Sequence, residues 1–141
     1  MRAAGRAALE WRAKIFFVPA GVPEKSIMRM CGQIDPQTAA QKYDDQLNAI
    51  ATESGEPIYQ HDLILPGLGD DGHTVSLFPG TAALGEMIRC VIANFVPKLN
   101  AWRLTFTCPL MNRARHICFS SERRKIPRMC SQATRNSPLR E

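Results

Sequence analysis

The sequence predicts an α/β domain, because helix-like and strand-like segments alternate through its middle part. A helical pattern over residues 36–52 precedes a short apolar run over 62–66, and two further apolar runs follow at 91–96 and 101–107. The run at 62–66 leads into a loop that holds three glycines, two aspartates and a histidine. Because ligand loops of α/β proteins follow the carboxyl ends of buried strands, this loop is the candidate functional site.

The first segment, residues 1–23, is a lead rich in alanine and arginine. Its beginning faintly resembles an organellar targeting peptide, and a helical or frayed terminus is the other interpretation; the apolar core of a secretory signal is absent. Within this lead, residues 15–18 form a short apolar run that favours a strand and ends at a segment with two prolines.

A helix is predicted over residues 36–52. Asp35 stands at the N-cap and Pro36 at the first helical position, in the order that favours a helix start. Shortly before it lies Arg29, which is interpreted either as a substrate contact or as a solvated or salt-bridged arginine. Apolar residues recur at helical spacing and predict one packing face, formed by Ala39, Tyr43, Leu47 and Ile50.

Several shorter elements are predicted after the loop. Beyond them, residues 120–141 have few apolar residues and many charges, which predicts a disordered basic tail. The elements are a short helix at 81–89, strands at 91–96 and 101–107, a helical turn at 110–114 and a last buried strand at 117–119.

The net charge of +5 is concentrated at the two ends of the chain. Residues 1–14 carry +3 and residues 121–141 carry +4, whereas residues 15–120 carry −2. A basic tail without aromatic residues can contact phosphate backbones but does not stack bases, so we expect no nucleic-acid function. No apolar run approaches the length of a membrane span, so we expect no membrane partner.

The five cysteines are widely spaced and odd in number. They form no Cys-x-x-Cys pair and are accompanied by no paired histidines, which argues against both a disulfide framework and a zinc site. We therefore expect free thiols in a reducing compartment, a cytoplasmic location and no bound metal.

Three glycines of the loop, Gly67, Gly69 and Gly72, have the G-x-G-x-x-G spacing of dinucleotide-binding proteins. That fold needs a full helix after the third glycine, whereas Pro79-Gly80 leave room for only about one and a half turns. The strand at 91–96 also ends without the acidic residue that would hold a ribose hydroxyl. We therefore expect no dinucleotide and no other cofactor.

Two separated blocks of this sequence resemble the signatures of the 6-phosphogluconolactonases, a branch of the sugar-phosphate isomerase and lactonase superfamily. In the sister branch, the glucosamine-6-phosphate isomerases, the block around the glycine-rich loop usually ends in Asn-Glu-Pro-Gly. This chain has Leu77-Phe-Pro-Gly80 at that place, so an isomerase function is less favoured. The first block comprises Asp62-Leu-Ile-Leu65, Gly67-Leu-Gly69, Asp71-Gly-His-Thr74 and Ser76-Leu-Phe-Pro-Gly-Thr81. The second comprises Val91-Ile-Ala-Asn-Phe-Val-Pro-Lys98-Leu99 and Trp102-Arg103-Leu-Thr105-Phe-Thr107-Cys-Pro-Leu-Met-Asn112-Arg-Ala-Arg115.

The resemblance covers residues 24–119 and implies a Rossmann-like layered α/β fold, with a parallel sheet flanked by helices. It extends over only the later half of the family's domain. The N-terminal half, with its glycine-serine phosphate loop and its Asp-Glu-Arg motif, has no match here. The expectation is therefore a partial parallel-sheet α/β domain lacking its N-terminal half, between the lead 1–23 and the tail 120–141.

The resemblance implies hydrolysis of 6-phospho-D-glucono-1,5-lactone to 6-phosphogluconate in the pentose phosphate pathway, without a metal. His73 is the candidate general base and acid, because histidine titrates near neutrality. Asp71 is expected to orient its imidazole or to cap the following turn. Lys98 and Arg103 are candidate phosphate ligands, and their alternative role is that of solvated surface charges.

The loop glycines Gly67, Gly69 and Gly72 are expected to bind substrate through backbone N–H groups. The alternative function is a truncated, catalytically silent fragment that at most binds a sugar phosphate or a partner chain. Because half of the family's sheet is unmatched, an exposed sheet edge would also permit self-association.

Overall fold

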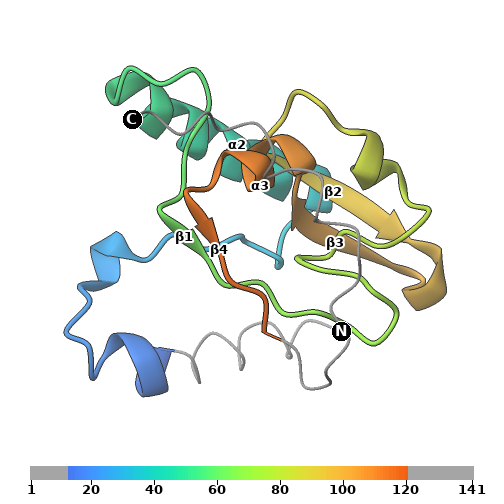
Figure 1. Cartoon of the computed structure of the whole chain (residues 1–141), viewed down its shortest axis with the longest axis horizontal. Helices are drawn as coiled ribbons and strands as arrows, with labels where there is room; N and C mark the ends of the chain where they lie inside the picture. Colours follow the sequence, from blue (N-terminus) through green and yellow to red (C-terminus); the bar gives the residue numbers. More distant parts are fainter. Residues whose placement is uncertain (1–12, 121–141) are drawn as a thin grey trace, which may run out of the picture.

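The computed structural model describes residues 13–120; residues 1–12 of the lead and residues 121–141 of the predicted tail lie outside this range. The order of elements along the chain is visible in Figure 1. The elements are the π-helix η1 (Ala13–Phe17), the 3-10 helix η2 (Glu24–Ser26), α2 (Pro36–Glu53), β1 (Leu63–Ile64), the 3-10 helix η3 (Ala82–Gly85), β2 (Val91–Val96), the 3-10 helix η4 (Pro97–Leu99), β3 (Ala101–Phe106), α3 (Cys108–Arg113) and β4 (His116–Ile117).

Helix α2 forms where the sequence predicts it and begins at the predicted cap. The carboxylate of Asp35 accepts hydrogen bonds at 2.9 Å from both the backbone N–H and the hydroxyl of Thr38. Pro36 occupies the first turn, where its missing N–H is not needed. The predicted stripe faces inward: Tyr43 and Leu47 are buried, and Leu47 is only 1% exposed.

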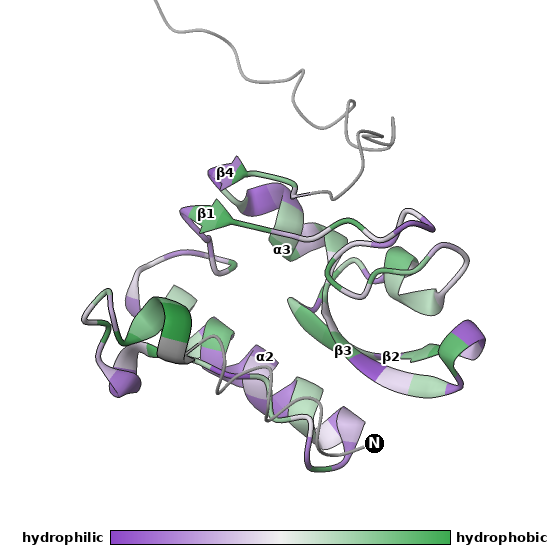
Figure 2. Cartoon of the chain, turned by 90° about the horizontal axis from the view of Figure 1, so that it is seen from below, coloured by the Kyte–Doolittle hydropathy of each residue, from purple (hydrophilic) through white to green (hydrophobic). Residues whose placement is uncertain are grey.

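Strands β2 and β3 form an antiparallel hairpin, with Val91 opposite Phe106 and Val96 opposite Ala101. The short helix η4 and Asn100, at a left-handed φ of 45°, make the turn between the strands. Because successive residues of a strand point to opposite faces, the hairpin presents two faces with different neighbours. It occupies one end of the molecule, beside α2 (Figures 1 and 2).

One hairpin face packs on α2. The buried cluster on this face joins side chains of α2, β2 and α3, and Leu104 and Phe106 of β3 pack against it. Burying a leucine or valine side chain contributes about 1.5–3 kcal/mol to the free energy of unfolding. This cluster is therefore the main apolar core of the described residues. The cluster consists of Ala40, Tyr43, Leu47, Cys90, Val91 and Leu110.

The opposite hairpin face packs on the segment that follows β1. Ile92 lies in a smaller buried cluster with Leu77 and Ala83, which come from that segment and from η3. The same hairpin face carries two buried polar side chains, Asn94 and Thr105. The site loop thus rests on a face that is partly apolar and partly polar.

Strands β1 and β4 form the parallel part of the fold. Leu63 pairs with His116 and Ile64 with Ile117, and Figure 1 shows these strands side by side, apart from the hairpin. The predicted α/β class is confirmed. Among the described strands only β1 and β4 pair in parallel, since the hairpin is antiparallel and forms a separate sheet.

Three local predictions are wrong. The last strand, predicted as buried at 117–119, is β4 at His116–Ile117, and Cys118 after it is exposed. The apolar run 15–18 lies in and just after the π-helix η1, with Phe16 66% exposed; a short apolar run does not by itself distinguish a strand from a helical turn. The helix predicted at 81–89 ends at Gly85. Its remainder is not helical, because the carboxylate of Glu86 accepts the backbone N–H groups of Ile88 and Arg89.

Candidate active site

The candidate site is built on the loop that follows β1. Gly67 bridges to Ser120 in the parallel direction, which extends the β1–β4 pairing into the loop. The loop then folds back on itself: the N–H of Gly69 donates to the carbonyl of His73 at 2.8 Å, and the N–H of Leu77 donates to that of Thr74 at 2.6 Å. These contacts hold the histidine in a tight double turn.

The ring of His73 has two close neighbours. It stacks on the ring of Phe78, with centroids 4.1 Å apart and an angle of 16° between the planes. It also lies so close to Gly69 that a Cβ at that position would overlap the imidazole. Only glycine therefore leaves room for the ring in this position.

Asp71 links the imidazole to a lysine. Its Oδ1 lies 2.5 Å from Nδ1 of His73, and its Oδ2 accepts a hydrogen bond from Nζ of Lys98 at 2.7 Å. The Lys98 ammonium, and after it the His73 ring, hold the pKa of the Asp71 carboxyl well below its usual range. Because a carboxylate can only accept, Nδ1 of His73 is the donor and Nε2 carries the lone pair of the neutral ring.

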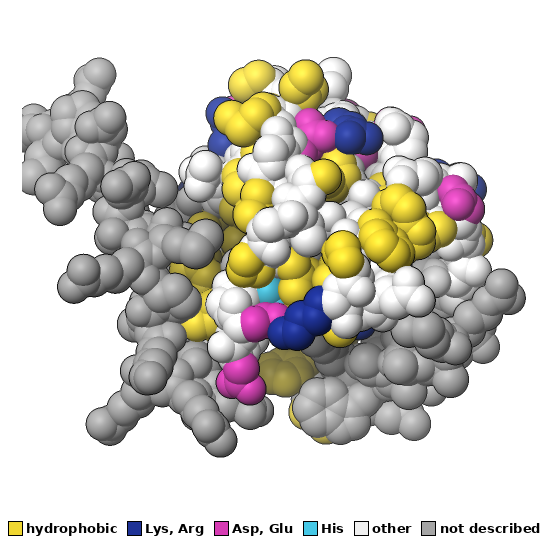
Figure 3. Space-filling view, turned by 90° about the vertical axis from the view of Figure 1, so that its right-hand side faces the viewer, with side chains coloured by type: hydrophobic (Ala, Val, Ile, Leu, Met, Phe, Trp, Pro, Cys, Tyr) yellow, Lys and Arg dark blue, Asp and Glu magenta, His cyan; other side chains and the backbone are white. Residues whose placement is uncertain are grey.

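The three side chains open onto a cavity of about 550 Å³, within the usual range for small-molecule sites. Lys98 comes from η4 and Arg103 from β3, so the hairpin supplies both basic groups while the loop supplies the acid–histidine pair. Figure 3 shows a histidine beside acidic and basic side chains on this face, among hydrophobic ones. The lining residues are Asp70, Asp71, His73, Ser76, Phe78, Lys98, Leu99 and Arg103.

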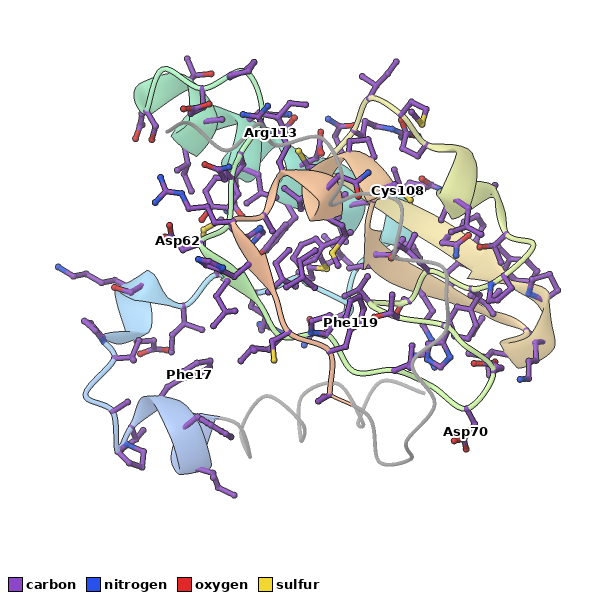
Figure 4. The ribbon with its side chains drawn as sticks, in the orientation of Figure 1. Phe17, Asp62, Asp70, Cys108, Arg113 and Phe119 are labelled. Carbon is purple, nitrogen blue, oxygen red and sulfur yellow. The ribbon has the colours of Figure 1, made fainter. Side chains whose placement is uncertain are left out.

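The cavity is electrically balanced. Lys98 and Arg103 supply two positive charges, and Asp70 and Asp71 supply two negative charges. Asp70 projects outward from the loop (Figure 4), whereas Asp71 is engaged by Lys98. A phosphate dianion would therefore meet Arg103 and a lysine already paired with a carboxylate.

The structure brings together four of the predicted site residues, namely His73, Asp71, Lys98 and Arg103. The three glycines do not line the cavity, and the N–H groups of Gly69 and Gly72 donate to carbonyls within the loop. Substrate binding by Gly67, Gly69 and Gly72 stays a prediction.

Arg29, the other arginine considered for substrate contact, donates to Gln33 at 3.0 Å and does not line the cavity. Sequence reasoning missed Phe78 and Ser76 as cavity residues. Their signal was present in the sequence, since both lie in the block that resembles the lactonases.

Residues 13–120 contain no group of three histidine, cysteine, aspartate or glutamate side chains placed to hold a metal ion. The cysteines in this range, Cys31, Cys90, Cys108 and Cys118, are not in disulfides. No helix in the described part of the chain is long and apolar enough to cross a membrane.

The chain is similar to known proteins of one family. Residues 7–137 match the model of the family described as glucosamine-6-phosphate isomerases/6-phosphogluconolactonase. The chain belongs to this family. The match extends beyond both ends of the predicted domain at 24–119, and those domain boundaries stay a prediction.

Several curated relatives in this family are named 6-phosphogluconolactonase. That of Chlamydia muridarum is 42% identical over 97 residues, covering 68% of this chain and 35% of the relative. That of Synechocystis is 43% identical over 99 residues, covering 70% of this chain and 40% of the relative. The human protein is 32% identical over 99 residues, covering 70% and 38%. The chain thus spans between about a third and two fifths of the length of these relatives.

Solved structures show the same partial likeness. A crystal structure of devB protein is 31% identical, with a TM-score of 0.59 over 70% of this chain and 41% of that one. The 6-phosphogluconolactonase of Trypanosoma brucei is 27% identical, with a TM-score of 0.53 over 74% of this chain and 43% of that one. The described elements therefore correspond to part of the lactonase fold.

Proposed function

We propose that this site hydrolyses the lactone 6-phospho-D-glucono-1,5-lactone to 6-phosphogluconate. The observation that carries the proposal is the arrangement of Asp71 and His73 at the cavity, with Nδ1 of the ring engaged by the carboxylate and Nε2 left as the basic nitrogen. The relatives' names supply the substrate class, and membership of the family supports its transfer to this chain.

The proposed reaction needs one proton to be taken up and returned. Nε2 of His73 accepts a proton from water as the water oxygen attacks the lactone carbonyl carbon. The resulting imidazolium is stabilised by Asp71, which faces Nδ1. When the tetrahedral intermediate collapses, the bond from the carbonyl carbon to the ring oxygen breaks, and the imidazolium returns the proton to that oxygen.

In this proposal the phosphate is bound by Arg103 and Lys98. Arg103 offers a planar fork of donors suited to phosphate. The lysine must divide its ammonium between Asp71 and the ligand, because it is already 2.7 Å from that carboxylate. Since the cavity carries no net positive charge, the site is expected to bind a phosphosugar weakly.

The test is lactone hydrolysis measured as acid release above the spontaneous rate, with His73→Asn as the variant. Loss of general base and acid catalysis is expected to lower the rate by about 10²–10⁴-fold. The matched control is His116→Asn, since this exposed histidine lies on β4 and not in the cavity. A full chain without activity above the spontaneous rate, or a His73→Asn variant as active as wild type, contradicts the proposal.

The alternative is a site that binds a sugar phosphate without turning it over. The electrical balance of the cavity favours it. The measurement is a thermal melt with millimolar 6-phosphogluconate, because a ligand of the folded state raises the midpoint. A raised midpoint without hydrolysis supports binding alone, and an unchanged midpoint without hydrolysis contradicts both functions for this chain.

We also propose that the β1 side of the parallel pair is a surface for self-association. Parallel strands are normally buried on both faces, yet Leu63 is 51% and Leu65 is 68% exposed. A mass measurement by light scattering would show dimers that a Leu65→Lys variant weakens; a monomer at all concentrations contradicts this.

A cytoplasmic location stays part of the proposal and is supported by the unpaired cysteines between residues 13 and 120.

A further inference from the structure

The turn at Val75 and Ser76 has a backbone conformation that these residues rarely adopt. Their φ angles are 43° and 70°, in the left-handed region, and Val75 is β-branched. Such a conformation is strained and persists only when its surroundings impose it. The turn therefore needs partners elsewhere in the fold.

The carbonyl groups of both turn residues are held by buried polar side chains of the hairpin. Thr105 Oγ1 donates to the carbonyl of Val75 at 2.6 Å, and Asn94 Nδ2 donates to that of Ser76 at 3.3 Å. Thr105 is 1% and Asn94 is 2% exposed. Asn94 also donates to Thr81 Oγ1 at 3.0 Å, which ties the far end of the loop to the same strand.

The turn stands between the two stacked rings of the site. His73 precedes the four-residue turn Thr74–Leu77 and Phe78 follows it, so the turn fixes the separation and tilt of their rings. The same ring of His73 meets Asp71 on Nδ1. Any relaxation of the turn is transmitted directly to the imidazole.

We propose that Asn94 and Thr105 are positioning residues that hold the Val75–Ser76 turn and thereby set the orientation of the His73 ring in the cavity. This inference rests on the proposed lactone hydrolysis for its catalytic meaning, but its geometric content does not depend on turnover. Neither residue lines the cavity, so each acts through the loop and not on substrate.

Burial of these side chains has a thermodynamic requirement that fits this role. A buried hydroxyl or amide costs free energy unless it is hydrogen-bonded. The hairpin face that carries them also packs Ile92 in an apolar cluster. If packing alone mattered, apolar residues would suit positions 94 and 105 as well. Both polar groups reach carbonyls of the site loop, which links their burial to the loop's shape. The Thr105 hydroxyl also lies 2.9 Å from the carbonyl of Phe106 in its own strand.

The decisive experiment compares Thr105→Val with Thr105→Ser in the full chain. Valine has the shape of threonine but cannot donate, whereas serine keeps the hydroxyl. Proton NMR reports the ring geometry through the ring-current shift of the His73 Cε1–H and through Overhauser contacts between the rings of His73 and Phe78. His116, which does not face this turn, serves as the reference within each spectrum.

The expected result is that Thr105→Val loses the ring contacts and the ring-current shift while Thr105→Ser keeps both. In the hydrolysis assay, a misplaced catalytic group is expected to lower kcat by up to about 100-fold with little change in KM. Thr105→Val with unchanged ring contacts and unchanged kcat, at any thermal midpoint, overturns the inference. Changed ring contacts in a chain that never hydrolyses the lactone support the positioning role and contradict the proposed function.

Thr105→Val on its own is at risk of failing to fold. The double variant Thr105→Val, Val75→Gly covers that case, because glycine accepts a left-handed φ without strain. We expect this variant to fold with the His73 and Phe78 rings no longer stacked. A folded double variant with the wild-type ring contacts also overturns the inference.

Discussion

The two faces of the β2–β3 hairpin are built from the same two strands but are stabilised in different ways. The face toward α2 is apolar, and its residues pack on Tyr43 and Leu47 of a regular helix. The face toward the site loop carries Asn94 and Thr105, which bind the carbonyls of a strained turn. Apolar packing, with the buried carboxylate of Asp44 at the start of β2, stabilises one face, and directional polar contacts on the other give the loop its shape.

This difference has a consequence for how each face responds to substitution. Apolar contacts are non-directional, so their loss lowers the free energy of unfolding without a specific effect on the site. Hydrogen bonds to a strained turn have a fixed geometry, so their loss changes the site more than the stability of the whole. The following predictions test that separation.

The largest effect is expected from Leu47→Ala on the α2 face. Leu47 is 1% exposed, and truncating such a side chain removes buried area and leaves a cavity, which costs about 2–5 kcal/mol. Urea unfolding followed by far-ultraviolet dichroism measures this loss. The matched control is Ile88→Ala, because Ile88 is 82% exposed and its truncation is expected to change stability by less than about 0.5 kcal/mol. Equal losses in the two variants would show that this face is not the core.

A smaller loss is expected from Asp44→Ala, which removes a polar anchor of the same face. Oδ1 of Asp44, a buried residue, accepts the N–H groups of Cys90 and Val91 at 2.7 and 2.9 Å. Without it these two buried donors lose their acceptor, which costs about 1–3 kcal/mol. Asp44→Asn retains an oxygen and is expected to lose clearly less. An asparagine variant as unstable as the alanine variant would mean that the negative charge, not the acceptor, is what stabilises the start of β2.

Much of the α2 face could be predicted from the sequence. Helix α2, its cap at Asp35 and its inward stripe follow from spacing, and the strands of the hairpin follow from two apolar runs. Asp44 was not predicted, because its partners Cys90 and Val91 lie 46 and 47 residues further along the chain. Local patterns do not report which backbone groups a fold leaves without a partner.

The candidate site was predictable in its residues but not in its geometry. The resemblance named His73, Asp71 and Lys98, and the structure joins them through one carboxylate. The supporting pair, Asn94 and Thr105, lies in the second block of the resemblance and in the predicted strands, but neither pattern gave these residues a role. Polar residues inside a strand carry no signal of their role until the neighbouring loop is in place.

Gly69→Ala is expected to affect the site with little effect on overall stability. A Cβ at this position overlaps the His73 imidazole, and the side chain of the histidine can move to relieve the overlap. We therefore expect loss of the His73–Phe78 stacking and a fall in any lactonase rate, while the unfolding midpoint changes little. Gly85→Ala is the control, because a Cβ there meets no atom within 4 Å. If Gly69→Ala lowers the midpoint as much as Leu47→Ala does, the site loop is part of the core and the two faces are not separable.

The smallest effect is expected from Glu86→Gln, which repeats the chemistry of Asp44 at the surface. Oε1 of Glu86 accepts the N–H groups of Ile88 and Arg89 at 2.9 and 3.1 Å, and Oε2 accepts from the Arg89 guanidinium at 2.6 Å. The Ile88 N–H, followed by the groups of Arg89, lowers the pKa of the Glu86 carboxyl from 4.5 to about 2.

The sign of the pH dependence follows from this lowered pKa. Between about pH 4.5 and pH 2 the unfolded chain binds a proton at Glu86 that the folded chain does not, so the stability contributed by this carboxylate is complete above that window and is lost as the pH falls through it. Urea unfolding at several pH values should therefore show a shallower acid-side loss in Glu86→Gln than in wild type. Because the contacts lie at the surface, where water screens them, the difference should be smaller than that between Asp44→Ala and wild type. Identical acid-side slopes of stability in wild type and Glu86→Gln would show that the contact does not form in solution. A difference in stability as large as that between Asp44→Ala and wild type would show that burial does not decide the strength of these two carboxylate anchors.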